Sequence, residues 1–126
     1  MSNPNTLLLD SNTIMYLIKG DEKVFQLVDR KPVAISFITE IELLGWKLMT
    51  PELQTVILDL IKDIHYFDYS HRVKQRTINL RQKYNFKLGD AFIAATALEF
   101  DLTLVSADRI FSKVEDLRLI NFSPSV

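Results

Sequence analysis

The segment GDAFIAATALEFDLTLVSAD, residues 89–108, joins a helical pattern to a short strand pattern. From Ala91 to Leu98 there is no charged residue, and apolar side chains occur on all sides of the predicted helix. A helix of this kind is buried on most of its surface. The run LTLVS at 102–106 is almost continuously apolar, as in parallel strands that are covered on both faces. Together they predict a sheet enclosed by helices.

The same alternation extends toward both ends of the chain. Strand patterns occur at residues 6–10 and 33–38, with weaker ones at 64–69 and 117–122. Helical patterns lie between them, at residues 13–19, 22–29, 51–62 and 70–84. This order predicts an α/β fold with an open, mostly parallel central sheet flanked by helices.

Composition limits the classes of protein that the chain can belong to. Its 126 residues, 48% of them hydrophobic, predict one domain over residues 1–126. The net charge of -1 means that any contact with nucleic acid needs a local basic patch. The absence of cysteine excludes disulfides, thiolate zinc sites and cysteine nucleophiles, and fits a cytoplasmic protein. No export signal or membrane span is expected.

Four acidic positions fall near the ends of predicted strands or the start of the buried helix. They are Asp10, one of Glu40 and Glu42, Asp90, and Asp108. In open α/β sheets, functional sites form beyond the carboxyl ends of the strands and near helix N-termini. Acids from distant parts of the chain are therefore expected to meet in one place.

Each acid also has an ordinary structural explanation. Asp10 and Asp90 could cap helices, and Asp108 could form an Asx-turn. Glu42 follows Thr39 by three residues, which fits a capping box. If the four carboxylates do meet, their repulsion raises their pKa values or requires a cation. A site made only of oxygen ligands selects Mg²⁺ or Mn²⁺, which suits phosphodiester hydrolysis.

Three segments carry a resemblance to a known family: LLLDSNTI (7–14), ISFITEIELLG (35–45) and KLGDAFIAATALEFDLTLVSADRIF (87–111). In this order they resemble the acidic motifs of PIN-domain nucleases, especially VapC-like toxins of toxin-antitoxin pairs. The resemblance implies a three-layer PIN-like fold and a Mg²⁺-dependent endoribonuclease. It also implies an RNA substrate, a homodimer and a cognate antitoxin that covers the acidic pocket.

The resemblance also assigns roles to individual residues. It implies that Asp10 and Asp90 bind the metal directly and that Glu42 and Asp108 bind it through water. The supporting polar residues would be Asn12, Thr39 and Ser106. Many relatives carry a further acid where this chain has Ile110, which keeps open a catalytically silent PIN scaffold that binds RNA or protein.

A basic stretch offers candidate contacts for RNA. Between Tyr69 and Gly89 there are six Lys or Arg residues and no acid. The candidate RNA-binding residues are Arg72, Arg76 and Lys83 on the predicted helix, and Arg109 beside Asp108. The alternative is a solvated helix face. A phosphoacceptor receiver domain, another class of Mg²⁺-binding α/β protein, is disfavoured because LLLDS supplies only one acid after the first strand.

Overall fold

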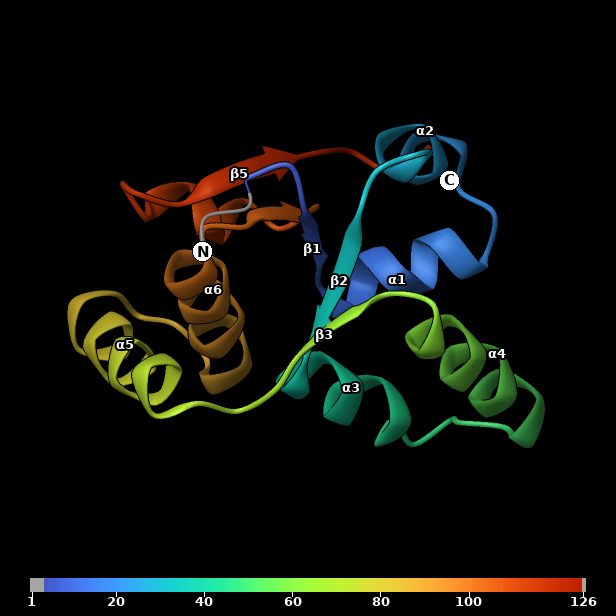
Figure 1. Cartoon of the computed structure of the whole chain (residues 1–126), viewed down its shortest axis with the longest axis horizontal. Coiled ribbons are helices and arrows are strands. Elements are labelled where there is room, and N and C mark those ends of the chain that lie inside the picture. The colour runs from blue at the N-terminus through green and yellow to red at the C-terminus, as the bar shows by residue number, and fades with distance from the viewer. Residues whose placement is uncertain (1–3, 126) are drawn as a thin grey trace.

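A five-stranded parallel sheet forms the centre of the structure, a computed structural model that describes residues 4–125 (Figure 1). The strand order is β3-β2-β1-β4-β5. The strands are β1 (Leu7–Leu9), β2 (Val33–Ser36), β3 (His65–Phe67), β4 (Thr103–Ser106) and β5 (Arg118–Asn121). The helices are α1 (Ser11–Ile18), α2 (Glu22–Val28), α3 (Phe37–Leu44), α4 (Pro51–Lys62), α5 (His71–Lys83), α6 (Leu88–Phe100) and the 3₁₀ helix η1 (Arg109–Lys113).

Helices cover both faces of the sheet, which makes the three-layer α/β fold that the sequence predicted (Figure 1). Successive residues of a strand point to opposite faces. Leu8 of β1 therefore packs in one core cluster with residues of α5 and α6. Leu7 and Leu9 pack in a second cluster with residues of α1, α2 and α4. Burial on both faces explains why these strands are apolar runs without alternation.

Helix α6 belongs to the first of these core clusters. Six of its residues are buried: Ala91, Ile93, Ala94, Ala95, Thr96 and Ala97. The small alanine side chains allow the helix to pack closely against its neighbours. The prediction of a mostly buried helix from the charge-free segment is confirmed.

Polar side chains fix where five helices begin. At each start, the capping side chain accepts a hydrogen bond from the backbone N–H three residues later, which satisfies a group that has no partner inside the helix. The capping residues are Asp10, Asp21, Ser36, Thr50 and Ser70. The predicted starts at Thr50 and Ser70 are confirmed. Helix α1 begins at Ser11, two residues before its predicted start, because Asp10 caps it.

The end of the second strand was predicted wrongly. The strand pattern at 33–38 ran through Phe37 and Ile38, but β2 stops at Ser36 and both residues belong to α3. Ser36 caps α3 through its hydroxyl, so the chain turns directly from strand to helix. This junction brings α3 to the carboxyl edge of the sheet.

Two further properties limit the classes of fold. The order β3-β2-β1-β4-β5 differs from the order 2-1-3-4-5 of flavodoxin-like receiver domains, which rules out that alternative. The longest helices within residues 4–125 have 13 residues, and none is long and apolar enough to cross a bilayer.

Candidate metal-binding acidic site

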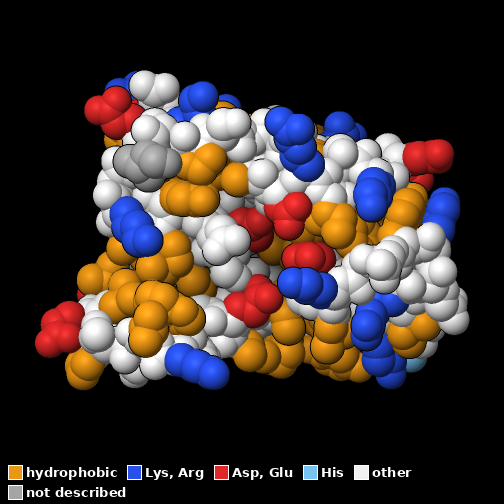
Figure 2. Space-filling view, turned by 180° about the vertical axis from the view of Figure 1, so that it is seen from behind, with side chains coloured by type: hydrophobic (Ala, Val, Ile, Leu, Met, Phe, Trp, Pro, Cys, Tyr) orange, Lys and Arg blue, Asp and Glu red, His pale blue; other side chains and the backbone are white. Residues whose placement is uncertain are grey.

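All four predicted acids line one pocket at the carboxyl edge of the sheet. Asp10 follows β1, Asp108 follows β4, Glu42 comes from α3, and Asp90 comes from the first turn of α6. The remaining lining residues are Ser11, Asn12, Gly89 and Ile93. The pocket has a volume of about 180 Å³, enough for an ion together with several waters. Figure 2 shows a group of acidic side chains at the middle of one face, with Lys and Arg side chains around it.

Asp10 is held by residues from two elements. Its Oδ1 accepts hydrogen bonds from the backbone N–H of Thr13, at 2.9 Å, and from the Thr13 hydroxyl, at 2.6 Å. Its Oδ2 accepts a short hydrogen bond from the hydroxyl of Ser106, at the end of β4. The capping alternative for Asp10 is therefore confirmed, but capping does not remove the carboxylate from the pocket, because it lines the pocket as well.

Ser106 links Asp10 to Asp108. This serine is fully buried. Its hydroxyl donates to Asp10 Oδ2 and accepts from the backbone N–H of Asp108 at 3.0 Å. Asp108 Oδ1 in turn accepts from the N–H of Ile110 at 3.0 Å, so the predicted Asx-turn is confirmed. One buried hydroxyl thus sets the positions of two acids that are 98 residues apart in the sequence.

Glu42 points into the pocket and does not close a capping box. The capping residue of α3 is Ser36, so Thr39 lies inside the helix and the capping-box alternative is wrong. The Glu42 Oε1 atom instead accepts a 2.6 Å hydrogen bond from the hydroxyl of Ser11 in α1. Its carboxylate also lies against Gly89 of α6. Glu42 is therefore held between two other helices.

The neighbouring Glu40 has a different partner. Its Oε1 accepts a 2.6 Å hydrogen bond from the Tyr66 hydroxyl of β3. Desolvation by burial, together with this carboxylate, raises the pKa of Tyr66. Two residues along a helix correspond to a rotation of about 200°, so Glu40 and Glu42 point in opposite directions. Of the two, only Glu42 lines the acidic pocket.

Asp90 is the acid most affected by the others. Burial raises its pKa above the usual value of 3.8, and the charges of Asp108 and Glu42 raise it further. Lys87 opposes this effect, and Asp10 adds a smaller contribution in the same direction as the first two acids. The capping alternative for Asp90 is wrong, because α6 begins after Lys87 without a side-chain cap and Asp90 lies in its first turn. Because the charges of the three other acids all act on Asp90, the four carboxylates form one electrostatic group.

The donor chemistry of this group fits a hard divalent cation. All four acids offer oxygen, the ligand atom that Mg²⁺ and Mn²⁺ prefer. Within residues 4–125, no group of three or more Asp, Glu or His side chains has the arrangement of a formed metal site. Mg²⁺ binds proteins through one or two carboxylates and keeps several waters, so a site of this kind needs only part of the group as direct ligands. A bound cation would offset the repulsion that raises the pKa of Asp90.

The two other supporting residues differ in position. Asn12 is exposed and lines the acidic pocket. Thr39 is buried, and its hydroxyl accepts a 3.1 Å hydrogen bond from Ser36. Thr39 is not among the residues that line the pocket, so its position supports the junction between β2 and α3.

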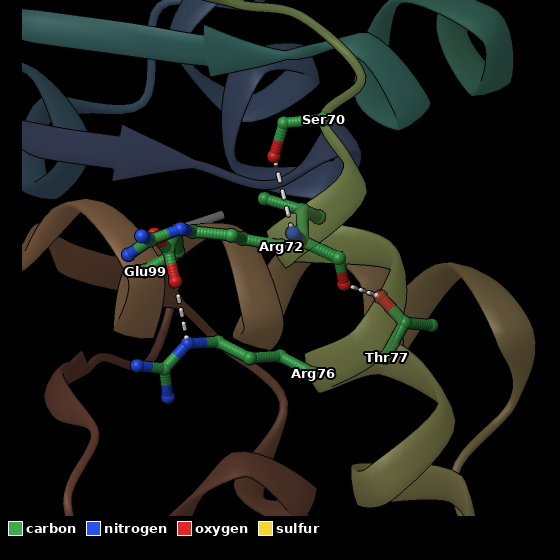
Figure 3. Close-up of polar contacts among 6 residues, drawn as sticks. Ser70, Arg72, Arg76, Thr77 and Glu99 are labelled. Carbon is green, nitrogen blue, oxygen red and sulfur yellow. Dashed lines mark hydrogen bonds and ion pairs between the residues drawn. The ribbon is translucent and has the colours of Figure 1, made fainter.

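The candidate RNA-binding arginines of α5 are tied to α6 (Figure 3). Arg76 Nε donates to Glu99 at 2.8 Å, and an Arg72 guanidinium nitrogen lies 3.8 Å from the other Glu99 oxygen. The Glu99 side chain is only 14% exposed and pairs with both arginines. Glu99 lies nine residues after Asp90, or about 14 Å along α6. The carboxylate that pairs with both arginines is therefore distant from Asp90 along α6.

The other two candidate cations have different surroundings. Lys83 lies over the ring of Tyr84, with its Nζ 5.5 Å from the ring centroid. Arg109 is exposed and directly follows Asp108. Of the four cations, Arg109 is the one adjoining a pocket acid in the sequence.

Sequence reasoning missed three residues that shape the pocket: Ser11, Thr13 and Gly89. Ser11 and Thr13 lie in the first turn of α1, where polar residues are common because they stabilise the start of a helix. The sequence therefore does not show that these two residues also bond to pocket acids. Gly89 gave a usable signal. Glycine is unfavourable inside a helix, and its place before Asp90 indicates a close approach by another group.

The sequence was compared with models of known protein families and with known proteins. Residues 7–117 match the model of the PIN domain family. No curated protein sequence matches the chain.

Solved toxin-antitoxin structures share the fold. A toxin-antitoxin complex from Klebsiella pneumoniae is 27% identical, with a TM-score of 0.78 over 91% of this chain and 96% of that chain. DNA-bound VapBC from Salmonella typhimurium is 25% identical, with a TM-score of 0.78 over 92% and 97% of the two chains. VapBC2 from Rickettsia felis, bound to a promoter DNA fragment, is 22% identical, with a TM-score of 0.80 over 94% and 99%, and this likeness supports the fold alone.

Proposed function

Because this chain belongs to the PIN domain family, we propose that it is a Mg²⁺- or Mn²⁺-dependent endoribonuclease and the toxin of a toxin-antitoxin pair. The observation that carries the proposal is the convergence of Asp10, Glu42, Asp90 and Asp108 on one pocket at the carboxyl edge of a parallel sheet. Nothing in residues 4–125 places a cysteine or histidine in that pocket. The chemistry of the site is therefore that of carboxylates and a bound cation.

Asp10 and Asp90 are the residues that would hold the cation directly. Asp10 has a fixed orientation, because both of its oxygens accept hydrogen bonds. Asp90 accepts no hydrogen bond from the described residues, so its charge is open to a ligand. When bound, the cation supplies an activated water and stabilises negative charge on the phosphoryl oxygens.

Glu42 and Asp108 would act through water. Glu42 keeps Oε2 open to the pocket because Ser11 occupies Oε1. Asp108 keeps Oδ2 open because the N–H of Ile110 occupies Oδ1. Each can therefore accept a hydrogen bond from a water in the pocket and orient it toward a phosphodiester bond.

RNA is the substrate class that the proposal assigns. The acidic pocket repels a bare phosphate, so substrate entry needs both the cation and basic residues at the rim. Arg109 adjoins Asp108 and is exposed, which suits contact with a phosphate near the pocket. Arg72, Arg76 and Lys83 would contact more distant parts of the strand, in competition with Glu99 for the two arginines.

A cognate antitoxin is the proposed protein partner, and a homodimer is the proposed assembly. A groove lined by Met15, Leu43 and Trp46 adjoins the acidic pocket and shares Ser11 and Glu42 with it. Trp46 is 46% exposed there. A partner that covered this groove would also close the pocket. Trp46 is the only tryptophan of the chain, so its fluorescence measures such an interaction directly.

A silent PIN scaffold remains a second candidate function, because of Ile110. Its side chain packs against the core cluster of α5 and α6, so this position offers the pocket no further acid. A scaffold of this kind would bind RNA or protein without cleaving it.

Cleavage of RNA separates the two candidates. The purified chain is incubated with a structured RNA in the presence of Mg²⁺, Mn²⁺ or a chelator. We expect cleavage with either cation, none with the chelator, and none for Asp90→Asn, whose fold is checked by circular dichroism. RNA binding without cleavage under every condition would favour the scaffold.

A further inference from the structure

The strongest unexplained feature of the pocket is the contact between Gly89 and Glu42. A Cβ atom built on Gly89 would lie 2.5 Å from Glu42 Oε2 and 3.4 Å from the carboxylate carbon. The first distance is far shorter than any ordinary contact between such atoms. The carboxylate therefore occupies the space that any side chain other than glycine would fill.

The hydrogen-bonding pattern makes this contact specific. Ser11 holds the other oxygen, Oε1, at 2.6 Å. The Glu42 carboxylate is thus fixed on one side by a hydroxyl of α1 and limited on the other by the backbone of α6. Asp90 is the next residue after Gly89, so the missing side chain allows the Glu42 carboxylate to lie against the turn of α6 that carries Asp90.

Conformation does not account for this glycine. Positive φ, the usual reason for glycine, occurs within the described chain at Gly20 and at two other residues, but not at Gly89. Gly89 lies in the first turn of α6, where alanine is the better helix former. Helix stability therefore does not explain the glycine at residue 89. The space left by its missing side chain, which the Glu42 carboxylate occupies, does.

We propose that Gly89 is a positioning residue: the absence of its side chain sets where the Glu42 carboxylate lies relative to Asp90. This inference rests on the proposed function, since it concerns the same site. An added methyl group would meet the end of a flexible, exposed side chain, not backbone. The fold can therefore accept alanine at residue 89, and what changes is the position of the carboxylate.

The test is a cycle of three variants: Gly89→Ala, Glu42→Asp and the double substitution. Gly89→Ala should lower kcat for RNA cleavage by up to about 100-fold, the order of magnitude for a misplaced reacting group, with little change in KM. Its melting temperature should equal or exceed that of the unchanged protein. Glu42→Asp alone should also lower kcat.

Compensation between the two positions gives the decisive comparison. Aspartate is one methylene shorter than glutamate and leaves room for the alanine methyl group. In the Gly89→Ala background, Glu42→Asp should therefore raise kcat, whereas it lowers kcat in the unchanged protein. Calorimetric titration with Mn²⁺, without RNA, should show the same reversal in affinity. Leu88→Ala, which changes an exposed neighbour in the same helical turn, is the matched control and should leave kcat and Mn²⁺ affinity unchanged.

Two outcomes would overturn the inference. One is normal cleavage and Mn²⁺ affinity in Gly89→Ala. The other is simple multiplication of the two single effects in the double variant. Failure of the proposed function looks different, since the unchanged protein itself would then neither cleave RNA nor bind Mn²⁺.

Discussion

Ser106 offers a stability test of the link between two pocket acids. Its buried hydroxyl donates to the carboxylate of Asp10 and accepts from the N–H of Asp108. A hydrogen bond to a charged group contributes about 1.5–3 kcal/mol to stability, and one between neutral groups about 0.5–1.5 kcal/mol. Ser106→Ala should therefore lower the free energy of unfolding by about 2–4.5 kcal/mol.

Urea denaturation followed by circular dichroism measures this loss. Ser112→Ala is the matched control, because Ser112 is an exposed serine of the adjoining segment whose hydroxyl donates to the carbonyl of Arg109 at 2.7 Å. We expect that control to lose less than about 1 kcal/mol. Without denaturant, folded Ser106→Ala protein should also cleave RNA much more slowly than the unchanged protein, because Asp10 loses the hydrogen bond that fixes its orientation. Equal stability losses for the two serine variants would refute the role given to Ser106.

Three further predictions follow from the charges of the site. Without metal, Asp90→Asn should be more stable than the unchanged protein at pH 7, because the raised pKa of Asp90 means that its ionised form destabilises the folded state. This difference in stability should vanish below pH 3.8, the ordinary pKa of an aspartate, where Asp90 is protonated in both the folded and the unfolded state. Melting curves across pH measure this, and a less stable Asn variant at pH 7 would contradict it. Mg²⁺ at 100 times its dissociation constant should stabilise the unchanged protein by about 2.7 kcal/mol, or about 10 °C in melting temperature, and should not stabilise Asp10→Asn; equal shifts would exclude Asp10 as a ligand. Arg109→Ala should weaken RNA binding more than Arg72→Ala, because Arg72 already pairs with Glu99; filter binding at several salt concentrations tests this, and equal losses would count against it.

Local patterns predicted the sheet and most helices correctly. The apolar runs at residues 6–10 and 102–106 identified β1 and β4, because strands buried on both faces leave a clear signal. The pattern failed at Phe37 and Ile38, since an apolar pair suits either a buried strand or a buried helix. Ser36 was the available signal, because serine is a common capping residue.

Contacts between distant residues were beyond the sequence pattern. Periodicity did not choose between Glu40 and Glu42, and the family resemblance favoured Glu42, the one that lines the pocket. The pairing of Arg72 and Arg76 with Glu99 joins residues 23 or more apart, which no local pattern reveals. The positive charge of α5 is therefore partly neutralised by Glu99.

The most direct test of the acidic site is calorimetric titration of the unchanged protein and its single variants with Mn²⁺. If the acids form one cation site, Asp10→Asn and Asp90→Asn should abolish binding, and Glu42→Gln and Asp108→Asn should weaken it. Glu40→Gln is the matched control, because Glu40 bonds to Tyr66 outside the pocket, and it should bind Mn²⁺ normally. Undiminished binding in Asp90→Asn, or a greater loss in Glu40→Gln than in Glu42→Gln, would contradict the account.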